Sequence, residues 1–109
     1  MLEKPYAIDP QRTEKDFLEF VTDVDNLGQW LIYHTYDSRR SQAGFPDLVL
    51  TLGGRVIFAE LKTQKGRLRP TQRDWLDALS ICNGVEAYLW RPSDANAIMN
   101  TLLGHRLIR

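Results

Sequence analysis

Asp47, Glu60 and Lys62 are the residues whose types and spacing could do chemistry together. Two apolar runs rich in β-branched residues, 48–52 and 56–61, flank a Gly-Gly pair, which predicts a hairpin with a two-residue turn. Counting back from that turn places Asp47 directly opposite Glu60, with Cβ atoms about 4.5–5.5 Å apart. Lys62 shares the face of Glu60, because alternate residues of a strand point the same way. The sequence therefore predicts two carboxylates and one ammonium at the end of the hairpin away from its turn.

Two acids directly opposite each other in a strand pair repel, so a purely structural hairpin is expected to avoid them. A divalent cation resolves this conflict, and Mg²⁺ in particular binds oxygen ligands from one or two carboxylates plus water and phosphate. The structural alternative is that Asp47 starts a strand after Pro46 while Glu60 and Lys62 form a surface ion pair. The opposed register favours a site for Mg²⁺ or Mn²⁺.

The elements that must position these residues can be read from the apolar periodicity. A helix is expected after Thr13, whose spacing to Asp16 is typical of a capping box, and Gly28 is expected to end it. Its apolar residues recur at helical spacing: Phe17, Phe20, Val21, Val24 and Leu27. Glu14 lies one turn before this stripe, so it borders the buried face or serves the helix N-terminal dipole.

The rest of the chain alternates between strand and helix patterns. Residues 30–35 and 85–90 are expected to be strands, Pro70 suits the first turn of a helix, and Ser93 is expected to cap a short last helix. That last helix is expected to turn Ile98, Leu102 and Leu103 inward, and Tyr88 and Trp90 are expected in the core. The order α-β-β-β-α-β-α predicts an α/β fold with a mixed central sheet flanked by helices.

The charges are segregated although the net charge is zero. Residues 39–73 hold only two acids, Asp47 and Glu60, and eight bases: Arg39, Arg40, Arg55, Lys62, Lys65, Arg67, Arg69 and Arg73. This balance of +6 is matched by −6 in the remainder. A basic segment around an acidic pair is expected where a phosphate backbone lies over a metal, and a solvated basic loop is the alternative for residues 65–69.

Length and composition indicate one domain of 109 residues, with a lead-in over 1–12 and the domain over 13–109. No apolar run approaches the ~20 residues of a membrane helix, and residues 1–12 lack the apolar core of a secretory signal. Cys82 is the single cysteine, which excludes an internal disulfide and fits a reducing cytoplasm. Two histidines and one cysteine argue against a structural zinc site.

Pro46-Asp47, the hairpin, and then Glu60-Leu61-Lys62 resemble the signature of the PD-(D/E)xK nuclease superfamily. The longer ordered set GFPDLVL, FAELK, GRLRPTQRDWLDAL and YLWRPSD resembles the VRR-NUC domain family, with a likeness running from about Thr13 to Leu103. The resemblance implies a restriction-endonuclease-like core. It also implies a metal-dependent endonuclease that hydrolyses phosphodiester bonds in DNA.

The resemblance also implies roles for single residues. The expected metal ligands are Asp47, Glu60, the Leu61 carbonyl and, directly or through water, Glu14. Lys62 is expected to orient the attacking water or neutralise developing charge. Gln72 begins an apolar helical stripe that continues with Trp75, Leu76, Leu79 and Cys82. A buried amide must be satisfied, so Gln72 is expected to orient water or phosphate, and a local bond to the preceding loop is the alternative. Arg39, Arg40, Lys65, Arg67, Arg69 and Arg73 are expected to bind the backbone.

A chain of this length leaves no room for a separate base-reading module, so recognition of branched DNA such as flaps or junctions is expected rather than of sequence. The resemblance implies that small members cleave junctions as symmetric dimers, which would present one active site to each of two strands. Two alternatives stay open. One is a non-catalytic DNA-binding or scaffold module, which would not need the intact set Asp47, Glu60 and Lys62. The other is an RNA-cleaving nuclease of the same chemistry, which the sequence does not separate.

Overall fold

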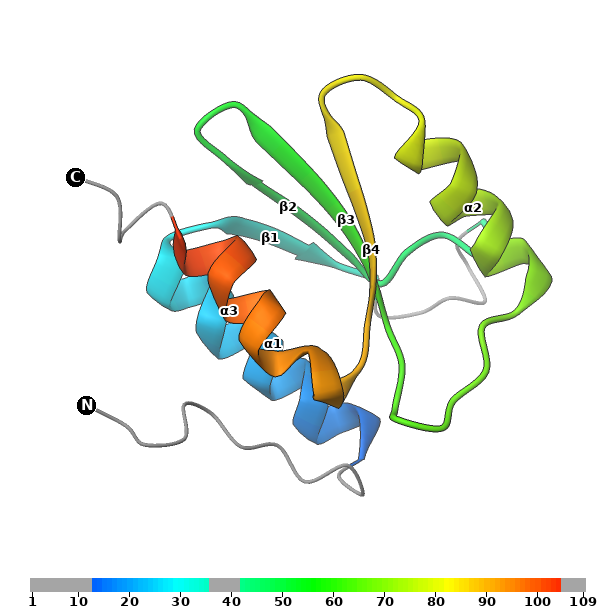
Figure 1. Cartoon of the computed structure of the whole chain (residues 1–109), viewed down its shortest axis with the longest axis horizontal. Coiled ribbons are helices and arrows are strands. Elements are labelled where there is room, and N and C mark those ends of the chain that lie inside the picture. The colour runs from blue at the N-terminus through cyan, green and yellow to red at the C-terminus, as the bar shows by residue number, and fades with distance from the viewer. Residues whose placement is uncertain (1–12, 36–41, 105–109) are drawn as a thin grey trace.

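The computed structural model describes residues 13–35 and 42–104, and the lead-in expected over 1–12 lies outside these ranges (Figure 1). In chain order the elements are α1 (Glu14–Gly28), β1 (Leu31–His34), β2 (Leu48–Leu52), β3 (Arg55–Leu61), α2 (Pro70–Ser80), β4 (Val85–Trp90), a 3₁₀ turn η2 (Pro92–Asp94) and α3 (Ala95–Leu103). None of the helices in the described ranges is long and apolar enough to cross a membrane.

The four strands form one mixed sheet in the order β1-β2-β3-β4. β1, β2 and β3 pair antiparallel, whereas β4 returns parallel to β3 after the crossover through α2. The predicted hairpin register is confirmed over five residue pairs, from Leu52 opposite Arg55 to Leu48 opposite Ala59. Gly53 and Gly54 have φ of 59° and 84°, and only glycine adopts two such angles in succession without strain. The mixed α/β fold expected from the sequence is therefore present.

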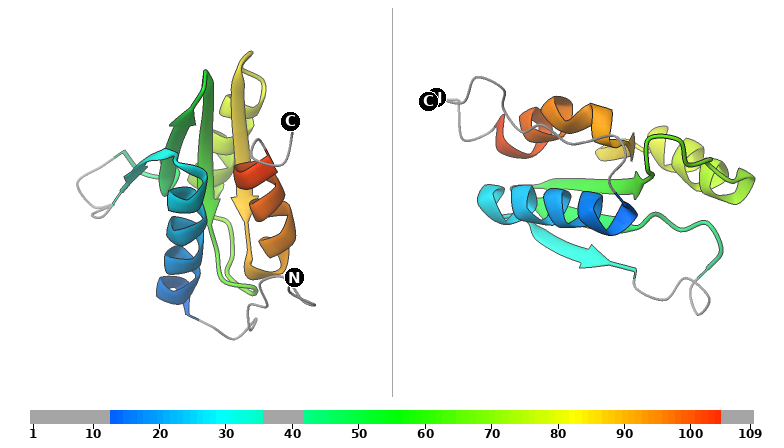
Figure 2. Two further views of the ribbon diagram at one scale, coloured as in Figure 1. Left: turned by 90° about the vertical axis from the view of Figure 1, so that its left-hand side faces the viewer. Right: turned by 90° about the horizontal axis from the view of Figure 1, so that it is seen from below.

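The core lies on one face of this sheet, where α1 and α3 pack side by side (Figure 2). The sheet residues that meet them alternate along β2 and β3: Leu48, Leu50, Ile57, Ala59 and Leu61. Glu60 falls between two of these core positions, so its side chain points to the opposite face. α2 packs on that opposite face, mainly along β4 (Figure 1). The acid predicted to bind metal is therefore covered by a different helix from the one that builds the core.

Helix α1 begins and ends where predicted, but one residue of its expected apolar stripe faces outward. Thr13 is the N-cap, and its hydroxyl accepts a hydrogen bond from the Asp16 amide at 3.2 Å. The helix ends at Gly28, as predicted, and the left-handed φ of 68° that follows belongs to Gln29. Leu27 is 61% exposed rather than inward. The reason is that Gly28 approaches α3 so closely that a Cβ there would lie 2.6 Å from the Leu102 carbonyl oxygen.

Three boundaries differ from expectation. β1 spans Leu31–His34, one residue shorter at each end than expected. At its start, Trp30 donates its amide to the Asp25 carbonyl of α1 rather than to a neighbouring strand. α2 ends at Ser80 and none of its residues is fully buried, so the expected stripe is only partly covered and Cys82 is exposed. The last helix is capped by Asp94 rather than Ser93, which lies within η2.

The expected core residues of the C-terminal part are largely confirmed. Trp90, Ile98 and Leu102 are buried, while Tyr88 and Leu103 are partly buried and pack against the core. The Trp90 ring stacks on Tyr88 with ring centroids 5.2 Å apart. Both aromatics therefore belong to the packing of β4 against the core, as expected.

Candidate active site

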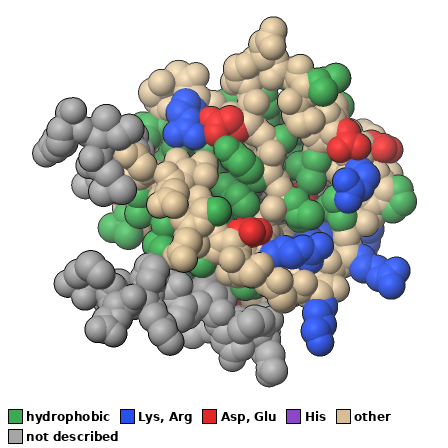
Figure 3. Space-filling view, in the orientation of Figure 1, with side chains coloured by type: hydrophobic (Ala, Val, Ile, Leu, Met, Phe, Trp, Pro, Cys, Tyr) green, Lys and Arg blue, Asp and Glu red, His purple; other side chains and the backbone are tan. Residues whose placement is uncertain are grey.

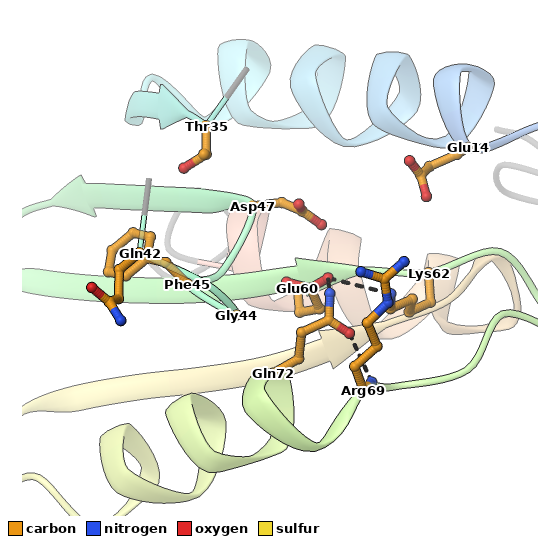
Figure 4. Close-up of a pocket in the computed structure, with 10 residues that line it drawn as sticks. All are labelled: Glu14, Thr35, Gln42, Gly44, Phe45, Asp47, Glu60, Lys62, Arg69 and Gln72. Atoms are coloured by element: carbon orange, nitrogen blue, oxygen red, sulfur yellow. Dashed lines mark hydrogen bonds and ion pairs between the residues drawn. The ribbon is translucent and has the colours of Figure 1, made fainter. Parts of the chain in front are cut away.

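A pocket of about 220 Å³ opens where the ends of β1 and β3 meet the start of α1, the start of α2 and the segment 42–47 (Figure 4). Ten residues line it: Glu14, Thr35, Gln42, Gly44, Phe45, Asp47, Glu60, Lys62, Arg69 and Gln72. The structure therefore brings five predicted catalytic residues and one predicted backbone-binding arginine to one cavity.

Asp47 reaches the end of β3 with its side chain rather than through strand pairing. The ladder stops at Leu48 opposite Ala59, so the predicted direct pairing of Asp47 with Glu60 is wrong. The Asp47 carbonyl accepts from the Thr35 amide at 2.9 Å, and its Oδ2 accepts from the Leu61 amide at 2.8 Å. Asp47 thus bonds the end of β1 through its backbone carbonyl and the end of β3 through its side-chain carboxylate. The carboxylate still lies beside Glu60, because Leu61 is the next residue.

Glu60 is buried, with 2% of its surface exposed, and is only half satisfied. Its Oε2 accepts from Gln72 Nε2 at 3.0 Å and lies 3.7 Å from Lys62 Nζ. Its Oε1 is buried and has no hydrogen-bond partner among the residues that the structure describes. Burial first, and then the charge of Asp47, raise the pKa of Glu60 to about 8, although Lys62 opposes the shift. A buried acceptor left in this state is costly unless a ligand completes it.

Gln72 bridges the start of α2 and the buried acid. Its Oε1 accepts from the Arg69 amide at 2.8 Å, while its Nε2 donates to Glu60 (Figure 4). Both ends of the side-chain amide are thus engaged inside the protein. The local bond to the loop, which was the alternative interpretation, is present together with a bond to the predicted metal ligand. Gln72 consequently fixes the orientation of Glu60.

The segment that carries Asp47 is fastened to α2. Gly44 has φ of +86°, and a Cβ at this position would lie 2.5 Å from the Thr71 carbonyl oxygen, so only glycine fits. The Phe45 ring meets Trp75 edge-to-face with centroids 5.0 Å apart. Trp75 Nε1 also donates to the Ala43 carbonyl at 3.2 Å. These contacts explain why Gly and Phe precede the Pro-Asp pair.

Glu14 lines the same pocket from the first turn of α1, where its side chain points toward the cavity (Figure 4). Within residues 13–35 and 42–104, however, no three His, Cys, Asp or Glu side chains come together as a metal-binding group. The role of Glu14 as a direct or water-mediated ligand therefore stays a prediction, as does that of the Leu61 carbonyl.

The predicted backbone-binding bases divide into two groups. Lys65, Arg67, Arg69 and Arg73 are exposed, and no salt bridge engages them within the described part of the chain. Lys and Arg side chains gather over the region of α2 and the loop before it (Figure 3). Only Arg69 of these four also lines the pocket. Arg39 and Arg40 lie outside the described residues.

Arg91 holds this basic loop in place. Its Nη1 donates to the carbonyls of Thr63 at 2.8 Å and of Gly66 at 2.7 Å. Gln64 adds two bonds to Ser93, one to its hydroxyl and one from its amide. The YLWRPSD segment thus positions the exposed bases next to the pocket.

Sequence reasoning missed several residues near and away from the site. Thr35, Gln42 and Phe45 line the pocket, and only the position of Phe45 beside Pro46-Asp47 signalled it. Asp25 is fully buried on α1, does not line the pocket, and has no hydrogen-bond partner for either carboxylate oxygen among the described residues. Burial raises the pKa of Asp25 to about 7.

The comparisons with known proteins agree on one family. The family model of the VRR-NUC domain matches residues 11–91. A solved VRR_NUC domain is similar over 80% of this chain and 94% of its own, with a TM-score of 0.66 and 15% identity. A solved VRR_NUC domain protein is similar over 85% and 89%, with a TM-score of 0.59 and 19% identity. These likenesses show the fold. No curated protein matches the chain significantly.

Proposed function

Because this chain belongs to the VRR-NUC domain family, a family of nuclease domains, we propose that it is a metal-dependent endonuclease that hydrolyses phosphodiester bonds in DNA. Its PD-(D/E)xK centre would consist of Asp47, Glu60 and Lys62. The observation that carries the proposal is the half-satisfied buried Glu60 next to Asp47 in an open pocket. Asp47 directly precedes β2, while Glu60 and Lys62 lie at and just after the end of β3, so the pairing of these two strands brings the three residues together.

The donor set fits a hard divalent cation. Glu60 Oε1 is a buried acceptor without a partner among the described residues, and Asp47 engages Leu61 through one carboxylate oxygen only. Oxygen donors from two carboxylates, with room for water, suit Mg²⁺ or Mn²⁺. Asp47 and Glu60 would hold the ion, assisted by the Leu61 carbonyl and Glu14. A cation would also remove the repulsion that raises the pKa of Glu60.

The bound ion would supply a water of lowered pKa and stabilise charge on the phosphate oxygens. The protein residues have separate tasks around it. Gln72 donates to Glu60 Oε2 and leaves Oε1 without a partner among the described residues, so Oε1 would be the oxygen that binds the ion. Lys62 Nζ lies 3.7 Å from Glu60 Oε2 and lines the pocket, so it would donate to the attacking water or to developing charge. Arg69 on the pocket rim would hold the scissile phosphate, with Lys65, Arg67 and Arg73 along the flanking backbone.

We further propose that the substrate is branched DNA and that the enzyme acts as a homodimer. Exposed bases bind phosphate without reading sequence, so specificity must come from the shape of the DNA. Two copies related by a two-fold axis would present one pocket to each of two strands.

The test is a cleavage assay on flaps, forks and four-way junctions with Mg²⁺ or Mn²⁺, and with chelator as control. We expect nicking near the branch in metal, none in chelator, and weak cutting of linear duplex. Protein that leaves every DNA uncut in both metals would instead support the scaffold alternative. Cutting of matched RNA but not DNA would support the RNA-cleaving alternative.

A further inference from the structure

Helix α2 contacts both segments that bear the pocket acids, β3 with Glu60 and the loop before Asp47. Through Gln72 it reaches Glu60 on β3, with Nε2 3.0 Å from Oε2. Through Trp75, one turn further along, it reaches the segment that leads to Asp47. The same short helix, α2, therefore contacts Glu60 and the segment that carries Asp47, although the two acids lie at the ends of different strands of the hairpin.

Trp75 makes two distinct contacts with the Asp47 segment. Its indole Nε1 donates to the Ala43 carbonyl at 3.2 Å, and its ring meets Phe45 edge-to-face at 5.0 Å and 81°. Phe45 in turn meets Phe58 edge-to-face at 6.0 Å and 87°. Phe58 lies two residues before Glu60 and shares its face of the sheet. A continuous aromatic chain thus joins α2, the Asp47 segment and β3.

This chain restrains the loop that bears Asp47. The Asp47 carboxylate accepts a hydrogen bond from the Leu61 amide, but Asp47 itself precedes the β2–β3 ladder, which stops at Leu48. The position of Asp47 beside Glu60 therefore depends on how its loop is packed. Aromatic edge-to-face contacts and a hydrogen bond to a backbone carbonyl provide such restraint at a fixed distance.

We propose that Trp75 is a positioning residue for the divalent metal, because it holds the Asp47 segment at the separation from Glu60 that the ion requires. The inference rests on the proposed function and adds a residue that touches neither metal nor phosphate. Its role differs from that of Gln72, which binds a metal ligand directly. Residues that orient metal ligands set affinity, commonly by a factor of about 10–100 when lost.

The alternative is that Trp75 only attaches α2 to the domain. Trp30 offers a matched comparison, since its indole Nε1 also donates to a backbone carbonyl, that of Leu102, at 2.8 Å and far from the pocket. A Trp→Phe change at either position keeps an aromatic ring and removes one such bond. Only Trp75→Phe should alter metal binding.

The experiment measures Mn²⁺ affinity by calorimetry and thermal melting in chelator for wild type, Trp75→Phe and Trp30→Phe. We expect Trp75→Phe to weaken Mn²⁺ binding about three- to tenfold, the factor of one hydrogen bond. Cleavage by this variant should recover at high Mn²⁺. Trp30→Phe should melt lower and bind Mn²⁺ as wild type does. Phe45→Leu, which retains bulk but not the ring edges, should weaken Mn²⁺ binding as well and provides a second variant.

Three outcomes overturn the inference or its premise, and they are distinguishable. Wild-type affinity in both Trp75→Phe and Phe45→Leu would make Trp75 a packing residue. Equal weakening in Trp75→Phe and Trp30→Phe would assign the effect to general destabilisation. Wild-type protein that binds no Mn²⁺ with or without DNA would instead remove the proposed metal site itself.

Discussion

Both ends of the β2–β3 hairpin have a buried or half-buried carboxylate beside them, and the two carboxylates differ in their hydrogen-bond partners. At the turn end, Arg55 Nε and Nη2 each donate to Glu86 at 2.7 Å, and the Tyr88 hydroxyl donates to the same carboxylate at 2.7 Å. The hydrogen bonds from Arg55 lower the pKa of Glu86 below its ordinary value. At the turn end, both carboxylate oxygens of Glu86 thus accept hydrogen bonds from side chains of the described residues.

At the open end, Glu60 has the less exposed carboxylate and the poorer partners. Gln72 offers one neutral donor, and Lys62 Nζ lies 3.7 Å away. Its pKa moves upward instead of downward, because burial and Asp47 disfavour its charge. The turn end is therefore satisfied by residues of the described chain, whereas Glu60 Oε1 at the open end has no hydrogen-bond partner among them. This difference is what we expect if Glu86 stabilises the fold and Glu60 binds the proposed cation.

Asp47→Asn should produce the largest effect. Loss of one carboxylate removes several kcal/mol of metal-dependent charge stabilisation, so cleavage should fall roughly a thousandfold or more. Stability in chelator should stay the same or rise, because the Asn oxygen can still accept from Leu61 and the repulsion on Glu60 is gone. Single-turnover cleavage and thermal melts measure both. A variant that melts well below wild type in chelator and still cuts would make the pair structural.

Glu86→Gln at the turn end should show the reverse pattern. It breaks the paired donation from Arg55, whose side chain is 39% exposed, so solvent screening limits the cost to about 1 kcal/mol of unfolding free energy. The rate of cleavage at saturating metal should not change. Urea unfolding and the assay on branched DNA check the two parts, and a variant that folds normally but loses cleavage would contradict the division between the ends.

The pH dependence of stability should expose the acids whose pKa is raised. Glu60 and Asp25 move from 4.5 and 3.8 to about 8 and about 7, so the folded state binds more protons than the unfolded state between those values. The stability that these two acids contribute to the folded state is fully present below about pH 4 and is lost as the pH rises to about 8. In chelator, the free energy of unfolding should therefore decline over this window. Asp25→Asn should remove the part of the decline that ends near pH 7.

Lys62→Met should have the smallest effect on stability. Its ammonium lies 3.7 Å from Glu60 Oε2, and removal leaves the two acids without this neighbouring cation. Because the raised pKa keeps much of Glu60 protonated at neutral pH, the loss of melting temperature in chelator should be slight and should grow toward pH 8. Mn²⁺ binding should persist while turnover is abolished. A melting temperature that rises with pH relative to wild type would reverse this interpretation.

Much of this contrast could be predicted from the hairpin sequence. Gly53-Gly54 fixes the turn, the turn fixes the register, and the register brings Asp47 close to Glu60. The detail that Asp47 reaches β3 by its side chain could not be predicted, because the Asp47 carbonyl is bonded by Thr35, which follows a third strand, β1. The local sequence pattern therefore predicts which residues come together, whereas the atoms through which they bond depend on contacts with other parts of the fold.

The helices show the limit of periodicity more clearly. Leu27 fits the apolar spacing of α1 but is 61% exposed, whereas its neighbour Gly28 is buried. Gly28 lies so close to the Leu102 carbonyl that only a residue without a side chain fits there. Likewise, Gln72 was recognised from its place at the head of an apolar stripe. Its simultaneous bonds to Arg69 and Glu60 follow only from how α2 lies on the sheet.

The most direct test of the central claim is Glu60→Gln, studied by thermal melting in chelator and by Mn²⁺ titration at pH 8. The neutral amide keeps the volume of the side chain and removes the charge that burial disfavours. We expect a higher melting temperature than wild type without metal, together with no measurable heat of Mn²⁺ binding and no cleavage. A lower melting temperature in chelator with wild-type Mn²⁺ binding would show that Glu60 belongs to the fold, as Glu86 does, and would contradict the account.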